Sequence, residues 1–183
     1  METKTLKKKY SMIIAIDPDV DGSGFAILDC EFKVLSTCRY TLPALAKILE
    51  GYKDCENILV VVEASYLVAS NWHLKSGDNQ RVAAAKGRNV GRNHEVGRQI
   101  VEFCKYFNVP YEEKIPLKKI WKGKDGKISR QELIDLCEGS GIGYKFAGND
   151  QEQRDAALLA IDRSGIPMIM PPKISKHKVH NNQ

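Results

Sequence analysis

Four acidic residues stand where this sequence passes from one predicted element to the next. Asp17 and Glu63 each end a short run of apolar residues, and Glu152 and Asp155 lie at the start of an apolar helix. Carboxylates gathered at one place repel one another unless a cation lies between them. Oxygen-only ligands favour Mg²⁺ or Mn²⁺ over zinc. Two such ions about 4 Å apart can activate a water and stabilise the leaving oxygen in phosphodiester hydrolysis.

Each of these acids also has a simpler explanation. Asp17 precedes a proline and could merely start a turn, and Glu63 could be an ordinary acid at a strand end. Glu152 follows Asn149 by three residues, so it could be the third-position partner of a helix cap. Asp155 is the hardest to explain away, because a carboxylate on an apolar helix needs a partner or a metal.

The elements that would position the first two acids are clear from the apolar pattern. Three β-rich runs, Met12–Ile16, Gly24–Leu28 and Val34–Tyr40, predict an antiparallel meander. A helix over 41–51 follows. Ile58–Val62 is apolar at every position, which is typical of a parallel strand covered on both faces. A strand, a crossover helix and a buried strand imply a sheet with parallel members.

The second half of the chain supplies the remaining elements. A helix is expected from Val82, and apolar residues at helical spacing make it clear up to Phe107. Tyr111–Ile115 predicts a short strand, and Ser129 opens a capping box before another helix. The last helix, over 149–163, is apolar all round in its middle and should be buried. The order predicts an α/β fold with a mixed five-stranded sheet, three antiparallel strands plus parallel strands, flanked by helices.

Positive charge is clustered along the chain. The 183 residues carry a net charge of +5, and residues 66–98 and 114–130 hold most of the excess. Clustered positive charge indicates a polyanionic partner, nucleic acid first of all, although a solvated surface would look the same. The expected phosphate contacts are Lys75, Arg81, Lys86, Arg88 and Arg92 near the site and Lys118, Lys119 and Lys122 on a more distant arm.

The bulk properties limit the remaining possibilities. We expect a basic disordered arm over 1–10, a single domain over 11–168 and a basic flexible tail over 169–183. No apolar run approaches the roughly 20 residues of a membrane span, and no signal peptide is indicated. Five cysteines without a C-x-x-C pair argue against a zinc site and for a reducing compartment, such as a bacterial cytoplasm.

One motif near the first acid imitates a calcium site. Asp17, Asp19, Asp21 and Gly22 are spaced as in the start of an EF-hand loop. The twelfth position is Leu28 rather than glutamate, and a strand rather than a helix precedes the motif. Asp19 and Asp21 are therefore expected to be turn residues, with at most a supporting role beside a metal.

Three motifs together resemble a known family. They are Ile-Ala-Ile-Asp17-Pro18 followed by Ser23-Gly24-Phe25, Val-Val-Val-Glu63, and Glu152-Gln-Arg-Asp155-Ala-Ala-Leu. This set is similar to the acidic motifs of the RuvC-like Holliday junction resolvases, in the ribonuclease-H-like nuclease superfamily. The resemblance runs from about Met12 to Ile161.

The resemblance implies a ribonuclease-H-like fold and a structure-selective endonuclease. Such an enzyme nicks branched DNA as a homodimer with Mg²⁺ or Mn²⁺, and Asp17, Glu63, Glu152 and Asp155 would be the ligands. Tyr66 falls where the family carries an aromatic that acts at the junction.

This sequence departs from the family pattern at two points. Asp19 stands where glycine is usual, and Glu152 stands where aspartate is common, which leaves Asp150 as a rival ligand. A nuclease of the same fold acting on RNA, as in ribosomal RNA maturation, and a binding protein without catalysis remain alternatives. The intact acid set speaks against the second.

Overall fold

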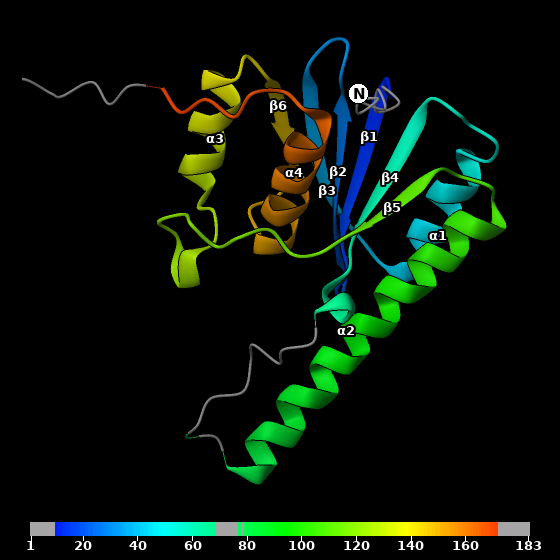
Figure 1. Cartoon of the computed structure of the whole chain (residues 1–183), viewed down its shortest axis with the longest axis vertical. Coiled ribbons are helices and arrows are strands. Elements are labelled where there is room, and N and C mark those ends of the chain that lie inside the picture. The colour runs from blue at the N-terminus through cyan, green and yellow to red at the C-terminus, as the bar shows by residue number, and fades with distance from the viewer. Residues whose placement is uncertain (1–9, 69–76, 78, 172–183) are drawn as a thin grey trace, which may run out of the picture.

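The computed structural model describes residues 10–68, 77 and 79–171. Within them one mixed sheet has the strand order β5-β4-β1-β2-β3-β6 (Figure 1). The strands are β1 (Met12–Asp17), β2 (Ser23–Asp29), β3 (Val34–Tyr40), β4 (Ile58–Glu63), β5 (Tyr111–Lys114) and β6 (Gly143–Phe146). The helices are α1 (Leu42–Gly51), α2 (Gln80–Tyr106), α3 (Arg130–Gly139) and α4 (Gln151–Ser164), with short 3₁₀ turns η1 (Ser65–Leu67) and η2 (Lys124–Gly126).

Strand directions confirm the predicted mixed sheet. β1, β2 and β3 form an antiparallel meander, while β4 runs parallel to β1 and β5 runs parallel to β4. The sequence did not indicate the sixth strand, β6, which pairs parallel with β3. Its four residues follow a glycine-rich stretch and are too few to show a period.

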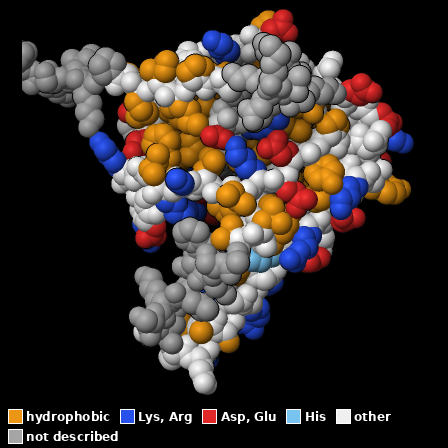
Figure 2. All heavy atoms as spheres, in the orientation of Figure 1, with side chains coloured by type: hydrophobic (Ala, Val, Ile, Leu, Met, Phe, Trp, Pro, Cys, Tyr) orange, Lys and Arg blue, Asp and Glu red, His pale blue; other side chains and the backbone are white. Residues whose placement is uncertain are grey.

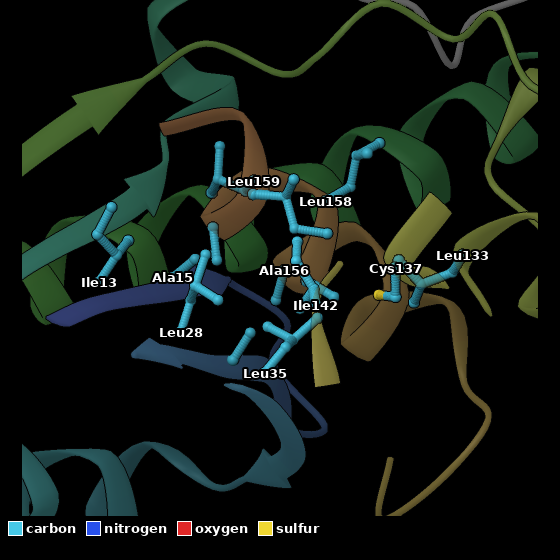
Figure 3. Close-up of a cluster of buried hydrophobic side chains, with 14 of the residues drawn as sticks. Ile13, Ala15, Leu28, Leu35, Leu133, Cys137, Ile142, Ala156, Leu158 and Leu159 are labelled. Atoms are coloured by element: carbon cyan, nitrogen blue, oxygen red, sulfur yellow. The ribbon is translucent and has the colours of Figure 1, made fainter. Parts of the chain in front are cut away.

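Alternate residues of the central strands point to opposite faces of the sheet and build two cores. On β1, Ile13 and Ala15 enter a cluster with α3 and α4, whereas Ile14 and Ile16 enter a cluster with α1 and α2. Figure 1 shows these helix pairs on opposite sides of the sheet, and Figure 3 shows side chains of the first cluster converging from β1, α3 and α4. Burial on both faces accounts for the apolar run that ends on Asp17.

The two halves of α2 differ in environment. Its buried residues lie between Val96 and Cys104, in the half that packs on the sheet. The half that begins at Gln80 extends past the end of the sheet (Figure 1). Within the described residues, no helix has both the length and the apolar character needed to cross a membrane.

Candidate active site

Asp17 and Glu63 meet at the carboxyl ends of two neighbouring parallel strands. Ile16 of β1 is level with Val62 of β4, so each strand's next residue is one of the two acids. Ligands of open α/β sheets collect at this edge, where the chain leaves the strands. The parallel pairing therefore brings together two carboxylates that lie 46 positions apart in the sequence.

The second pair of acids is brought to the same edge by a close contact between α4 and β2. Gly24 pairs with Asp17 across the hairpin. A Cβ placed on Gly24 would lie 1.9 Å from the carbonyl oxygen of Glu152, so only glycine lets the helix approach this closely. Thr37 on β3 donates a buried 3.0 Å hydrogen bond to the side-chain carbonyl of Gln153. The first turn of α4 is thus fixed beside Asp17.

Asp17 has the most perturbed acidity of the group. Burial raises the pKa of its carboxyl well above the usual range, and the charges of Glu63, Asp155 and Glu152 raise it further. The nearby ammonium group of Lys127 works in the opposite direction. The structure therefore brings the four acids predicted from the sequence close enough for their charges to interact.

Glu63 titrates near neutral pH. Burial, followed by the charge of Asp155, raises its pKa to about 7, although Lys127 and Lys119 lower it. Lys119 was expected on an arm distant from the site. Its charge acts on Glu63 from the connection between β5 and α3, so Lys119 lies nearer the acids than expected, and its contact with a phosphate stays a prediction.

Lys127 is a cation that is hydrogen-bonded to one of these acids, and the sequence did not single it out. Its Nζ donates a 2.9 Å hydrogen bond to Oδ2 of Asp155, while Oδ1 of the same carboxylate accepts from Nε2 of Gln151 at 2.7 Å. Burial opposes the charged form of Lys127, but the charge and the hydrogen bond of Asp155 hold its pKa above the usual range. An internal ammonium group thus balances part of the negative charge.

The segment that carries Lys127 is tightly folded. Gly126 adopts a left-handed φ of 74°, and a Cβ there would lie 2.8 Å from the carbonyl oxygen of Lys119. The predicted capping box is confirmed, since Ser129 and Glu132 exchange side-chain and backbone hydrogen bonds at the start of α3. These contacts hold the loop that presents Lys127 to the acids.

Asp150 caps α4. Its Oδ1 accepts from the backbone N–H of Gln153 and its Oδ2 from Nε2 of the same residue, both at 2.9 Å. The cap is therefore Asp150 and not Asn149, and the third helical position is Gln153 rather than Glu152. The capping explanation for Glu152 is wrong, and both oxygens of Asp150 are already engaged.

The donor set suits a hard divalent cation. Every candidate ligand is a carboxylate, and Asp17 lies half-buried where three other acids oppose its ionisation. Among residues 10–68, 77 and 79–171, no three His, Cys, Asp or Glu side chains are already arranged to hold a metal ion. Lys127 occupies one oxygen of Asp155. The four carboxylates suit Mg²⁺ or Mn²⁺ by their chemistry. Metal binding through both oxygens of Asp155 would require this residue to give up its hydrogen bond to Lys127.

Tyr66 packs against α2 at Gly97. Its hydroxyl donates to Oε2 of Glu113 at 2.5 Å, and the guanidinium of Arg98 lies 5.0 Å from the centre of its ring. A Cβ on Gly97 would lie 3.0 Å from the ring, so the helix backbone packs directly against it. Burial and Glu113 raise the pKa of Tyr66. The role of this aromatic at a junction stays a prediction.

The other predicted phosphate contacts lie on two segments. Arg81, Lys86, Arg88 and Arg92 lie on the half of α2 that extends past the sheet, and Lys118 and Lys122 are exposed beside Lys119. Lys75 lies outside the described residues. Figure 2 shows basic side chains along this helix and interspersed with acids on the same face of the molecule.

Solved structures of one protein are similar to this chain. No protein-family model and no curated protein matches the chain. Thermus thermophilus RuvC in complex with a Holliday junction substrate is similar over 88% of this chain and 100% of its own, at 15% identity and a TM-score of 0.46. Another structure of Thermus thermophilus RuvC is similar over 88% and 99%, at 17% identity and a TM-score of 0.43.

Proposed function

We propose that the chain is a divalent-metal-dependent endonuclease that nicks branched DNA such as a Holliday junction. The observation that supports this most directly is the convergence of Asp17, Glu63 and Asp155: beside burial, the charges of Glu63 and Asp155 raise the pKa of Asp17, and the charge of Asp155 raises that of Glu63. A purely structural site would match each acid with its own base. An excess of acids at the end of parallel strands is instead suited to cations and a phosphodiester.

The chain's own groups have distinct tasks in this proposal. Asp17, Glu63, Glu152 and Asp155 would hold Mg²⁺ or Mn²⁺, which when bound supplies an activated water and stabilises the leaving oxygen. Lys127 maintains the site in the absence of the cation through its hydrogen bond to Asp155.

Two basic segments lie on different elements of the structure. One is the extended half of α2, and the other is the connection between β5 and α3, which carries Lys119. Phosphate contacts on both would hold two arms of a branched nucleic acid with the bond to be cut between them, without reading its sequence. A homodimer would present two such sites to one junction, and this assembly stays a prediction.

The test is a cleavage assay on a synthetic four-way junction, a linear duplex of the same sequence and a single-stranded RNA. Each is incubated with Mg²⁺, Mn²⁺ or EDTA. We expect metal-dependent nicking of the junction, and an Asp17→Asn variant that binds the junction but does not cut it. Cleavage of RNA alone would overturn the branched-DNA assignment, and binding without cleavage under all conditions would leave only a binding protein.

A matched pair of variants tests the third ligand. Glu152→Gln removes the proposed ligand, whereas Asp150→Asn keeps a capping oxygen for the N–H of Gln153. We expect Glu152→Gln to weaken Mn²⁺ binding in calorimetry and Asp150→Asn to leave it unchanged. The reverse result would transfer the ligand role to Asp150.

A further inference from the structure

The turn between β1 and β2 is tied to α2 by a pair of polar side chains. Nδ2 of Asn93 donates to Oδ2 of Asp19 at 3.1 Å, and Oδ1 of Asn93 accepts from the backbone N–H of Val20 at 3.0 Å. The other oxygen of Asp19 accepts from the N–H of Asp21 at 2.9 Å. The carboxylate of Asp19 is therefore committed to joining the turn to the helix.

The same turn is held from the opposite side by β3. Nε of Arg39 donates to the carbonyl of Gly22 at 2.9 Å, and its guanidinium lies 3.7 Å from Oδ1 of Asp19. The turn follows Asp17 directly. Movement of α2 at Asn93 would thus be transmitted through the turn to the residue beside the first candidate ligand.

Asn93 occupies the base of the extended half of α2. The buried residues of the helix begin at Val96, one turn further on, and Arg81, Arg88 and Arg92 precede Asn93. The helix rises about 1.5 Å per residue, so its start lies about 20 Å from Asn93, and a tilt of about 10° would move it by roughly 3 Å. Misplacement of about 1 Å between reacting groups can lower a rate about 100-fold.

We propose that the Asp19–Asn93 pair is a positioning contact that sets the direction of the basic half of α2 relative to Asp17, and thereby selects which phosphate of a bound nucleic acid reaches the acids. The inference rests on the proposed function for its consequence in cleavage. It gives Asp19 a role that the nearby Asp21 does not share, because the carboxylate of Asp19 is hydrogen-bonded to α2 whereas Asp21 is exposed.

The pair can be tested by exchanging its two side chains. In Asp19→Asn/Asn93→Asp, the amide at 19 would donate to the carboxylate at 93, and both backbone N–H groups would keep their acceptors. Asn93→Asp alone opposes two carboxylates, and Asp19→Asn alone opposes two amide donors. Asn89→Asp and Asp21→Asn make the same charge changes at exposed neighbouring positions, so they and their double variant are the matched controls.

Cleavage is measured at saturating four-way junction and binding is measured separately. We expect Asn93→Asp to lower the nicking rate of the bound junction about 10-fold or more and to spread the nick over neighbouring phosphates. The exchanged double variant should recover the rate to within about 2-fold and return the nick to one position. Asn89→Asp should weaken binding only. Failure of the exchanged variant to recover, or identical behaviour of Asn93→Asp and Asn89→Asp, would overturn the proposal.

Hydrogen exchange of the free proteins separates this proposal from the proposed function. We expect the amides of residues 80–92 to exchange faster in Asn93→Asp than in the unchanged chain or the exchanged variant, with equal thermal midpoints to within a few degrees. If the unchanged chain cuts no substrate, the proposed function fails, and this measurement alone decides the contact. Equal amide hydrogen exchange in all variants would overturn the proposed role of the Asp19–Asn93 contact.

Discussion

The two ends of α4 carry the same kinds of charged side chain in opposite arrangements. At the end of the helix, Asp162 is paired with Lys114, and Arg163 donates to Glu112 at 2.6 Å. Both partners belong to the edge strand β5. Each acid there has its own base, which is sufficient to explain why these charges are tolerated at a partly buried contact between a helix and a strand.

The start of α4 lacks this balance. Asp155 and Glu152 face Asp17 and Glu63, and Lys127 provides the one hydrogen-bonded ammonium group that the described residues bring to these acids. Burial raises the pKa of Asp17, and repulsion from the other acids raises it further because Lys127 offsets only part of their charge. Matched pairs on a helix thus indicate structure, whereas an excess of one sign indicates a charged ligand.

The comparison is tested most strongly by removing one acid from each end of the helix. Asp155→Asn should lower metal-dependent nicking by about 1,000-fold or more, because one candidate ligand and the partner of Lys127 are lost. Asp162→Asn should leave the rate within about 2-fold and lower the free energy of unfolding by about 1 kcal/mol or less. Single-turnover cleavage and urea unfolding measure the two effects.

The assignment of roles to the two ends would be wrong if Asp162→Asn abolished cleavage while Asp155→Asn retained it. Equal losses in both variants, with normal unfolding curves, would show that pairing does not separate structural from functional acids on this helix.

The close approach of Gly24 to Glu152, which places the unbalanced start of α4, can also be disrupted. Gly24→Ala would put a Cβ 1.9 Å from the carbonyl of Glu152, so α4 must shift, and we expect a loss of about 3 kcal/mol in the free energy of unfolding. Gly51→Ala is the control, since a Cβ at Gly51 meets nothing within 4 Å. Urea unfolding should separate the two variants. Equal stability of both would show that α4 does not depend on this approach.

Much of the fold was accessible from local patterns. Ile58–Val62 is apolar throughout because both faces of β4 are covered, and the capping box at Ser129 fixes the start of α3 through neighbouring residues. Patterns of this kind depend on residues close in sequence. They predicted the five main strands, their directions and the four helices.

Contacts between distant residues were not accessible in this way. Asn93 meets Asp19 across 74 positions, and Lys127 reaches Asp155 across 28. Neither residue type is unusual where it stands, so no local pattern distinguishes Lys127 from the six other basic residues of 114–130. β6 was missed for a related reason, because a short edge strand is defined by its pairing with β3 rather than by its composition.

The ammonium group of Lys127, which is hydrogen-bonded to Asp155, predicts how the acids at the start of α4 respond to cations. Lys127→Gln removes a positive charge that competes for Asp155, so we expect Mn²⁺ to bind about 10-fold more tightly in calorimetry without nucleic acid. Lys124→Gln is the control, because Lys124 is exposed on the same loop. Weaker Mn²⁺ binding in Lys127→Gln than in Lys124→Gln would show that Lys127 supports the cation instead of competing with it.

The unbalanced end should also make the metal-free protein sensitive to pH. The pKa of Glu63 is raised from 4.5 to about 7, so the folded state holds a proton there that the unfolded chain has released. The free energy of unfolding should therefore fall as pH rises from about 5 to about 8, by roughly 1 kcal/mol or more, which lowers the thermal midpoint by a few degrees. Calorimetric melting in EDTA at several pH values measures this slope.

Two additions identify the source of the slope. Glu63→Gln should reduce the slope, since the amide does not titrate, while Asp17, whose pKa is also raised, should account for the remainder. Mg²⁺ should stabilise the unchanged chain more at about pH 8 than at about pH 5, because protons and cations compete for the same carboxylates. An unchanged slope in Glu63→Gln would show that Glu63 is not one of the titrating groups. A slope that decreases in Glu63→Gln but not in Glu112→Gln, at the balanced end, would show that the excess of acids rather than their number sets the pH response.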